Sequence, residues 1–570
     1  MEKKVRVVVL SIILLAMLVV SCAKEARQEP AYDWFREDEP AGEVVEEQPS
    51  LVQPKYEAEE EESYAYESVE EYEYAPAEEV SGDAASNEVI GEPEAFSYSA
   101  YPTAAPRDEG EADYDEENDN AFADYGVNPI VDTDEDQFST FAVDVDTGSY
   151  TIARRYLNEN EMPYPASVRV EEFINYFDQG YDRPSAREVF TINLEGGDAP
   201  FTESSNYQIL RVGIQGYEVD AYEREDVSLT FVIDVSGSMD LENRLELVKD
   251  SLELLVEQLR PDDRVSIVVY GSRARVVLEP TDGDEKDEIL WAIRQLQPEG
   301  STNAEAGLKL GYEMALRAFN HRGINRVILC SDGVANVGKT GAGSIWEEIE
   351  ARASEGITLT TVGFGMGNYN DVLMEQLADM GNGFYAYVDN HDEAERLFVE
   401  NLVSTLQVIA LDAKVQVEFN PNVVARYRLI GFENRDVADE DFRNDEVDAG
   451  EIGAGHSVTA LYEFKLYPGE RGEIATVSFR WQDPDDYEVS EISEVIHTRD
   501  LHDSFSEASF YFQWDVLTAE FAEILRESYW ARDTDLKDLL DSFEALDHRY
   551  NLDEDREECL EMVATAEWLD

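Results

Sequence analysis

Apolar residues repeat with two different periods between residues 226 and 405. Short continuous apolar runs such as "SLTFVIDV", residues 228–235, are typical of strands that are buried on both faces. Between these runs, apolar residues recur every three or four positions and so predict helices, as in Leu245, Val248, Leu252, Leu255 and Leu259. Strands that alternate with helices predict a Rossmann-like, doubly wound parallel sheet with helices on both faces.

The segments on either side of this region alternate apolar and polar residues instead. Two early segments, "EVFTINLEGG" and "NYQILRVGIQ", and several between residues 406 and 505 are typical of antiparallel strands. Two strands are too few to be stable alone, so we expect the early pair to join the later strands in a β-sandwich into which the α/β region is inserted. We expect residues 127–225 to form helices and then strands, and residues 506–570 to form helices. The predicted fold is multidomain, α/β plus β-rich.

The first residues are typical of a secretory signal. Lys3, Lys4 and Arg6 precede an apolar run from Val7 to Val20 that is too short to be a comfortable membrane span. The run ends in "VVSC", which resembles the lipobox of bacterial lipoproteins, a family in which the cysteine is lipidated. Residues 1–21 are therefore predicted to be a signal peptide and Cys22 the lipid anchor, which implies a place on a membrane of the bacterial cell envelope. An ordinary signal peptide with an incidental cysteine is the alternative.

Acidic residues dominate the whole chain, whose formal net charge is −83. Residues 22–126 are especially acidic and have no sustained periodicity, so we expect a disordered tether that holds the rest away from the lipid. The acidity argues against nucleic acid and anionic lipid as partners, because binding them requires Lys and Arg to neutralise phosphates. Only Cys330 and Cys559 follow Cys22, too few for a disulfide framework.

Polar residues with oxygen donors follow three of the predicted strands or precede the next helices. Asp234, Ser236 and Ser238 come directly after the first strand, Thr302 lies in a loop that opens a helix, and Asp332 follows another strand. In parallel sheets such loops meet at one edge and bind ligands there. Carboxylates and hydroxyls suit Mg²⁺ or Mn²⁺ rather than zinc, and few charged ligands leave a position open for a partner's carboxylate.

These residues also carry a family resemblance. Residues 226–405 resemble a von Willebrand factor A domain, and Asp234, Ser236, Ser238, Thr302 and Asp332 match its metal-ion-dependent adhesion site. The resemblance implies that the three hydroxyls coordinate the metal directly and the aspartates directly or through water. Flanking segments such as "FNPNVVARYRLIGFENR" resemble those of bacterial von Willebrand factor A lipoproteins. The function implied is that of a membrane-anchored binding protein that recognises an acidic group of a protein partner and breaks no bond.

Two other interpretations remain open. The metal site could serve only structure, in an assembly lipoprotein. The segment "FAVDVDTGSY", residues 141–150, contains the Asp-Thr-Gly of aspartic peptidases. Those enzymes need two such loops, and the chain has one, so we expect a structural turn in which Thr147 or Ser149 caps the following helix. The loop "GFGMGN", residues 363–368, lacks the spacing of a nucleotide-binding motif and is also predicted to be a tight turn.

Overall fold

The computed structural model describes residues 112–115, 120–143, 145–185, 187–202, 206–220, 222–333, 343–367, 369–445, 447 and 449–570. All of them belong to one structural unit, Phe96–Asp570. The predicted signal peptide, the Cys22 lipidation site, Asp144 and most of the predicted tether lie outside the described residues. Within the described ranges, no helix has both the length and the apolar character needed to span a bilayer.

The C-terminal boundary predicted for the tether, residue 126, is too late in the chain, because residues 120–123 form a strand. Strand β2, Asn120–Ala123, pairs antiparallel with β1, Ala112–Asp115. The Phe122 side chain is fully buried, and the backbone N–H of Ala121 donates to the carbonyl of Tyr369 at 2.8 Å. The prediction of a solvated spacer up to residue 126 is therefore wrong, since this short apolar segment packs against the α/β region.

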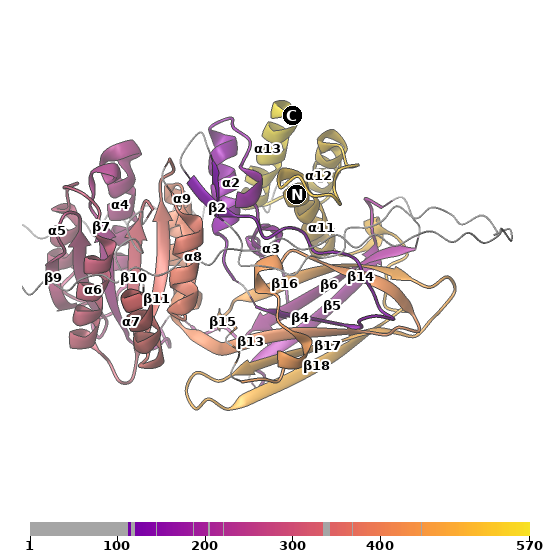
Figure 1. The fold of residues 1–570 in the computed structure, drawn as a ribbon, viewed down its shortest axis with the longest axis horizontal. Coiled ribbons are helices and arrows are strands. Elements are labelled where there is room, and N and C mark those ends of the chain that lie inside the picture. Colours follow the sequence, from indigo (N-terminus) through magenta and orange to yellow (C-terminus); the bar gives the residue numbers. More distant parts are fainter. Residues whose placement is uncertain are drawn as a thin grey trace, which may run out of the picture. The chain divides into compact units, whose positions relative to one another are not determined.

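The apolar runs of the α/β region form a six-stranded sheet, which we call the central sheet (Figure 1). Its strand order is β12-β11-β10-β7-β8-β9, parallel except for β9, which pairs antiparallel with β8 at one edge. Every residue of β7 is buried, because both faces of the sheet are covered. The strands are β7 Val227–Asp234, β8 Arg264–Tyr270, β9 Arg275–Asp282, β10 Ile324–Ser331, β11 Ile357–Phe364 and β12 Tyr385–Val388.

Helices cover both faces of the central sheet, as predicted. Alternate residues of β7 enter two separate cores: Phe231 packs with α4 and α5, whereas Val232 packs with α6, α7 and α8. A π-helical turn, η3, lies between the last two helices of this region, α9 and α10. The helices are α4 Arg244–Gln258, α5 Lys286–Arg294, α6 Ala304–Ala318, α7 Gly343–Ser354, α8 Asp371–Met380, α9 His391–Glu395, η3 Arg396–Glu400 and α10 Leu402–Leu406.

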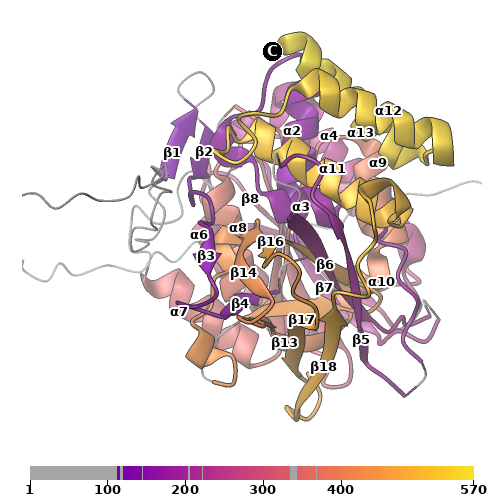
Figure 2. The ribbon, with the colours of Figure 1, turned by 90° about the vertical axis from the view of Figure 1, so that its right-hand side faces the viewer.

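Two further sheets pack face to face as a β-sandwich (Figures 1 and 2). One has the order β15-β13-β17-β18 with β4 paired to β13, and the other has the order β3-β14-β16-β6-β5. Because β6 pairs with β16, the expectation that strands before and after the α/β region join is confirmed. The strands are β3 Val131–Asp132, β4 Phe138–Ala142, β5 Phe190–Asp198, β6 Tyr207–Gly216, β13 Val408–Phe419, β14 Val424–Ile430, β15 Gly450–Gly453, β16 Ser457–Leu466, β17 Glu473–Gln482 and β18 Val489–His497.

Five helices pack together as a helical layer on the outer face of the second sandwich sheet, which α3 and α11 contact directly (Figure 2). Two come early, α2 Gly148–Asn158 and α3 Val170–Asn175, and three come last, α11 Phe510–Leu525, α12 Leu536–Tyr550 and α13 Glu554–Leu569. Ile209 of β6 and Leu461 of β16 belong to this helical core. The predicted order of helices then strands for residues 127–225 is incomplete, because β3 and β4 precede the helices and join the sandwich.

A buried arginine links the central sheet region to the helical layer. The Arg154 side chain of α2 donates from Nε to Asp389 at 2.9 Å, and from Nη2 to Glu393 of α9 at 3.0 Å. Its Nη1 also donates to Glu558 of α13 at 2.9 Å. Because Arg154, Asp389 and Glu393 are nearly inaccessible to solvent, each charge depends on the others for stabilisation.

Candidate metal site at the edge of the central sheet

Asp234 is the last residue of β7, and its carboxylate is held from two sides. It is fully buried, and its Oδ1 accepts a hydrogen bond from the backbone N–H of Ser236 at 2.7 Å. Its Oδ2 accepts from the hydroxyl of Ser331, the last residue of β10, at 3.2 Å. Because β10 lies directly beside β7 in parallel register, the ends of the two strands share this carboxylate.

The two serines that follow β7 lie beside each other. Ser236 precedes the short helix η2, Gly237–Asn243, and its Oγ lies 3.0 Å from the Oγ of Ser238. Ser236 is buried, whereas Ser238 is half-buried at the surface. Two hydroxyls and one carboxylate are therefore presented within one turn of the chain.

The loop that contains Thr302 lies against the same turn. The backbone N–H of Gly237 donates to the carbonyl of Gly300 at 3.1 Å, and the N–H of Glu299 donates to the carbonyl of Val235. Thr302 itself is half-buried and precedes Asn303, whose side chain caps α6. Two backbone hydrogen bonds therefore hold the Thr302 loop beside the turn of Ser236 and Ser238.

Asp332 follows β10 and reaches the same edge. It is only 4% exposed, and its negative charge acts on the carboxylate of Asp234. Burial and then the negative charge of Asp332 raise the pKa of Asp234 to about 6. The sheet thus brings two carboxylates together in a region from which water is largely excluded.

Arg244 is a site residue that the sequence analysis did not identify. As the first residue of α4, it donates from Nη1 to Oδ2 of Asp332 at 2.8 Å, and from Nη2 to the carbonyl of Met366. Gly365 adopts a positive φ of 79°, and a Cβ there would collide with the Arg244 side chain. Gly365, within the segment predicted to be a tight turn, therefore makes room for this arginine, a role for which sequence spacing gives no signal.

The donor set fits a hard divalent cation. Asp234, Ser236, Ser238, Thr302 and Asp332 offer only oxygen atoms, and Mg²⁺ and Mn²⁺ prefer such ligands. The described residues contain no group of three or more His, Cys, Asp or Glu side chains with metal-binding geometry. Asp234 and Asp332 are both buried, and Arg244 forms an ion pair with Asp332, so the two carboxylates together leave a negative charge that a cation would neutralise.

The Asp-Thr-Gly loop has a structural role that differs in detail from the one expected. Oδ1 of Asp146 accepts a hydrogen bond from the backbone N–H of Tyr385, the first residue of β12, at 2.9 Å. Neither Thr147 nor Ser149 caps α2 with its side chain, so that part of the prediction is wrong. Instead, the N–H of Ser149 donates to Glu172 at 2.7 Å. The loop fastens the helical layer to the edge of the central sheet.

Three family models match the chain. Residues 228–404 match the model described as von Willebrand factor type A domain, and residues 116–211 match the one described as von Willebrand factor. Residues 404–468 and 465–569 match the model described as the C-terminal region of the uncharacterized protein YfbK. The matches therefore cover the helical layer and the sandwich as well as the central sheet.

Individual proteins resemble different lengths of the chain. The chain is 40% identical over 360 residues to the YfbK protein of Escherichia coli (strain K12), and the match covers 62% of each chain. It is 27% identical over 214 residues to inter-alpha-trypsin inhibitor heavy chain H3 of Bos taurus, covering 36% of this chain and 22% of that one. A solved von Willebrand factor type A structure from Catenulispora acidiphila has a TM-score of 0.40 at 14% identity and covers 65% of this chain and 89% of its own. The alignment with the Escherichia coli protein covers less than two thirds of that protein's length.

Proposed function

This chain is homologous to bacterial YfbK and carries a von Willebrand factor type A domain, and on that premise we propose that it is a metal-dependent binding protein. Proteins with this domain typically mediate protein interactions. In this proposal, Asp234, Ser236, Ser238, Thr302 and Asp332 hold Mg²⁺ or Mn²⁺ at the edge of the central sheet. A bound ion would supply an open, electrophilic position for a carboxylate of a protein partner.

The observation that carries the proposal is the oriented pair of carboxylates, Asp234 and Asp332. Ser236 and Ser331 donate to the two oxygens of Asp234, and Arg244 donates to Oδ2 of Asp332, so both side chains are oriented before any ion binds. Leu241, which lies in η2 three residues after Ser238, is 56% exposed although it is apolar. An apolar side chain beside a polar site is a common arrangement at protein interfaces, so Leu241 is the residue we expect to contact the partner.

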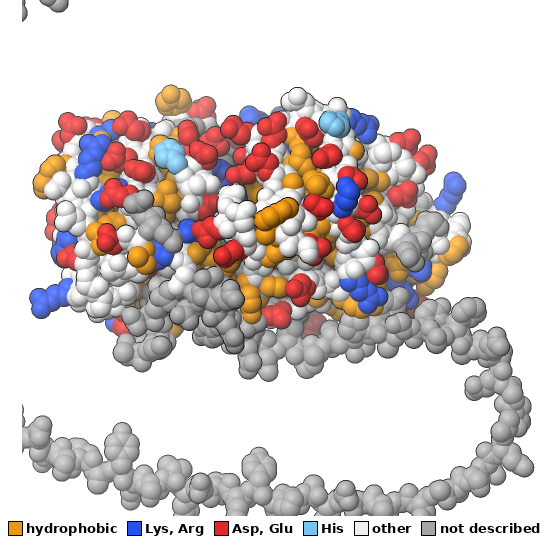
Figure 3. All heavy atoms as spheres, turned by 90° about the horizontal axis from the view of Figure 1, so that it is seen from above, with side chains coloured by type: hydrophobic (Ala, Val, Ile, Leu, Met, Phe, Trp, Pro, Cys, Tyr) orange, Lys and Arg blue, Asp and Glu red, His pale blue; other side chains and the backbone are white. Residues whose placement is uncertain are grey.

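The surroundings favour a protein partner over a polyanion. Acidic side chains are spread over the face seen in Figure 3, and the chain has 127 acidic residues against 44 basic ones. Such a surface repels nucleic acid and anionic lipid. We further propose that Cys22 is lipidated and anchors the chain to a membrane of the bacterial cell envelope, a proposal that rests on the "VVSC" sequence alone.

A structural metal is the second candidate, favoured by the burial of Asp234 deep in the sheet edge. An enzymatic function has less support, because Asp146 is engaged with the backbone of Tyr385 and is buried. We therefore propose that the chain is not an enzyme.

Metal binding and partner binding can be separated with four variants of the full-length chain. Mn²⁺ binding, measured by electron paramagnetic resonance, should be lost in Asp234→Ala and Ser236→Ala and kept in Asp262→Ala, which removes an exposed carboxylate of the same domain. Leu241→Ser should keep Mn²⁺ binding. Proteins crosslinked to the chain in envelope preparations should then disappear with EDTA and with Asp234→Ala, and should be reduced by Leu241→Ser.

The outcomes discriminate between the candidates. If Mn²⁺ binds to the wild type but crosslinking is insensitive to EDTA and to Asp234→Ala, the structural interpretation replaces the adhesive one. If Mn²⁺ does not bind, or binds equally to Asp234→Ala, the five residues do not form the metal site.

A further inference from the structure

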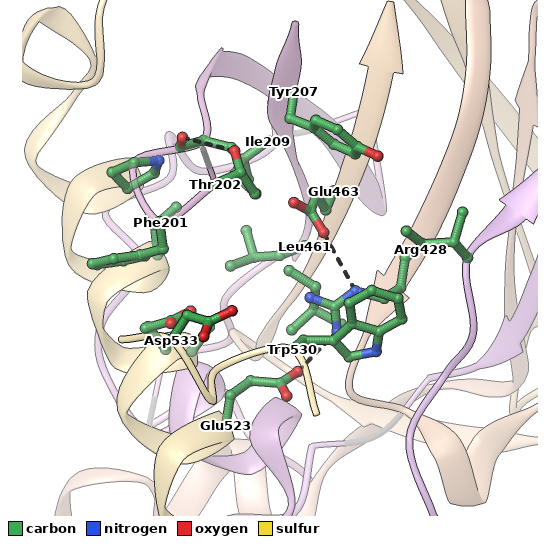
Figure 4. Close-up of a pocket in the computed structure, with 17 residues that line it drawn as sticks. Phe201, Thr202, Tyr207, Ile209, Arg428, Leu461, Glu463, Glu523, Trp530 and Asp533 are labelled. Atoms are coloured by element: carbon green, nitrogen blue, oxygen red, sulfur yellow. Dashed lines mark hydrogen bonds and ion pairs between the residues drawn. The ribbon is translucent and has the colours of Figure 1, made fainter. Parts of the chain in front are cut away.

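A cavity of about 290 Å³ lies between the second sandwich sheet and α11, and none of the five candidate metal ligands lines it (Figure 4). Its walls are mostly apolar, formed by residues of β6, β14, β16 and α11 such as Ile209, Leu461 and Val516. Aromatic side chains lie around it, among them Phe201, Tyr207 and Trp530. Apolar walls with a few polar groups are typical of sites for small molecules.

The polar groups in this cavity are mainly carboxylates. Glu463 of β16, Glu520 and Glu523 of α11, and Asp533 in the α11–α12 loop all line it, whereas Arg428 of β14 is the one basic side chain among the lining residues described. Since an apolar cavity disfavours unpaired charge, the balance between these groups decides what can enter.

Arg428 already interacts with two of these carboxylates. It donates from Nη1 to Oε1 of Glu523 at 3.0 Å, and its Nε lies 3.5 Å from Oε2 of Glu463. Its guanidinium also lies 4.9 Å from the ring centre of Trp530, which holds it against one wall. Little of its positive charge is therefore left for a ligand.

A second arginine nearby, Arg526, does not line the cavity and also interacts with two carboxylates. It donates to Oε1 of Glu523 at 2.9 Å and to Oε2 of Glu433 at 3.0 Å. Three carboxylates, those of Glu433, Glu463 and Glu523, thus pair with the two guanidinium groups of Arg428 and Arg526, and Glu520 adds a fourth carboxylate to the cavity lining. The cluster has an excess of negative charge when all of its members are ionised.

Glu520 forms no ion pair within the described part of the chain, and the charge of Arg428 only partly offsets the effect of burial on its pKa. The hydroxyl of Thr534 donates a hydrogen bond to Oε1 of Glu520. Burial raises the pKa of Glu520 to about 7, and the charge of Glu523 acts in the same direction. By contrast, Arg526 and Arg428 overcome the effect of burial and lower the pKa of Glu523 to about 2, so that group stays ionised. Oε2 of Glu523 accepts no hydrogen bond from the described part of the chain.

We propose that this cavity binds a small organic ammonium ion, whose charged nitrogen pairs with Glu520 and whose short apolar body contacts Ile209, Leu461 and Val516. Charge complementarity selects the cation, because the carboxylates outnumber the guanidinium groups. The apolar walls select a ligand with a hydrocarbon ring or chain over a simple inorganic cation, which would lose its hydration without new oxygen ligands on most sides. The aromatic rim adds surface suited to an ammonium group.

Isothermal titration calorimetry of the full-length chain with three matched probes tests the charge. The probes are 2-phenylethylammonium, neutral 2-phenylethanol and anionic phenylacetate, which share a ring and differ in the polar group. At pH 8, the ammonium probe should bind at least tenfold more tightly than the other two. Lowering the pH to 5.5 should weaken its binding, because Glu520 then takes up a proton while the pKa of Glu523 leaves that group ionised.

Three variants test the location. Glu520→Gln keeps the shape of the side chain but removes its charge, and should weaken binding of the ammonium probe at least tenfold. Ala519→Leu places extra atoms in the cavity and should weaken binding of all probes. Glu544→Gln, an exposed residue of α12, should change nothing. Circular dichroism melting curves establish that each variant is folded, and Glu520→Gln, which buries less charge, is expected to fold at least as well as the wild type.

Three results would overturn the proposal. If 2-phenylethanol binds as tightly as the ammonium probe, the cavity recognises apolar groups without regard to charge. If no probe binds saturably at pH 8, or if Glu520→Gln binds the ammonium probe like the wild type, then Glu520 does not form a cation site.

Discussion

Arg244 forms an ion pair with Asp332 at the metal site, with Nη1 and Oδ2 2.8 Å apart. Both side chains are almost fully buried, at 5% and 4% exposure. The guanidinium of Arg244 thus places a positive charge beside carboxylates and hydroxyls that suit a divalent cation. It holds Asp332 in place and also partly neutralises it, so a metal ion and the arginine compete for the same negative charge.

Removing that arginine should make the protein more dependent on metal. In EDTA, Arg244→Gln should lower the free energy of unfolding by about 3 kcal/mol, because Asp332 is left buried and unpaired. Saturating Mg²⁺ should restore most of this loss, since an ion that binds only the folded state stabilises it. Urea unfolding with and without Mg²⁺ measures both effects. Arg294→Gln, which removes an exposed arginine paired with Glu253, is the control. An equal Mg²⁺ effect in wild type and Arg244→Gln would contradict the competition.

The raised pKa of Asp234 predicts a pH dependence of stability in the absence of metal. Burial and the charge of Asp332 raise this pKa from 3.8 to about 6, so the folded state keeps a proton that the unfolded chain has already released. Stability from this group is therefore present at low pH and is lost as the pH rises through 6. Relative to Asp234→Asn, the wild type in EDTA should lose about 2 kcal/mol of unfolding free energy between pH 4.5 and 7.5.

Urea unfolding at a series of pH values measures this difference, with Asp262→Asn as a matched change at an exposed position. Added Mg²⁺ should abolish the loss in the wild type and leave Asp234→Asn unchanged. Parallel pH profiles for the wild type and Asp234→Asn would show that Asp234 ionises normally in the folded protein.

Two substitutions of Asp146 distinguish a structural from a catalytic role. Asp146→Ala removes the acceptor for the buried N–H of Tyr385 and should cost about 1–3 kcal/mol of stability. Asp146→Asn keeps an acceptor oxygen and should cost less, although it weakens the ion pair with Arg435, whose Nη2 lies 3.6 Å from the carboxylate. Thermal melts compare the two. If both variants are as stable as the wild type but a peptidase activity is lost, the structural interpretation is wrong.

Arg154 should be among the most sensitive positions for stability. Arg154→Met leaves Asp389 and Glu393 buried without their cation and should lower the unfolding free energy by about 3–5 kcal/mol. The control is Arg264→Met, because Arg264 and Asp282 form an exposed pair that should contribute about 0.5 kcal/mol or less. Chemical denaturation measures both changes. A loss for Arg154→Met no larger than that of the control would mean that the buried network contributes no net stability.

The elements of the α/β region and the sandwich were predictable because their apolar periods differ so clearly. Runs such as the one that became β7 have few alternatives, and the five oxygen-bearing residues follow from their places after strands or before helices. The pairing of β6 with β16 followed from the instability of an isolated strand pair.

Contacts between distant segments were not predictable in the same way. Arg244 looks like any helical arginine until β10 brings Asp332 beside it, and Asp146 meets Tyr385 only in the folded chain. Phe122 lies in an acidic, low-complexity context, so a short buried strand there has no periodic signal. The cavity under α11 depends on the shape of the gap between a helix and a sheet, which no local pattern encodes.

The insertion of the central sheet region into the sandwich has a consequence for the order of events during synthesis. Strand β6 ends at Gly216 and its neighbour β16 begins at Ser457, so the whole α/β region must leave the ribosome before this sandwich sheet can close. The α/β region has its own cores and can collapse first, whereas β5 and β6 wait with one edge unpaired. Truncated nascent chains that end before residue 457 should therefore expose a strand edge prone to aggregation, which makes holdase chaperones important for this chain.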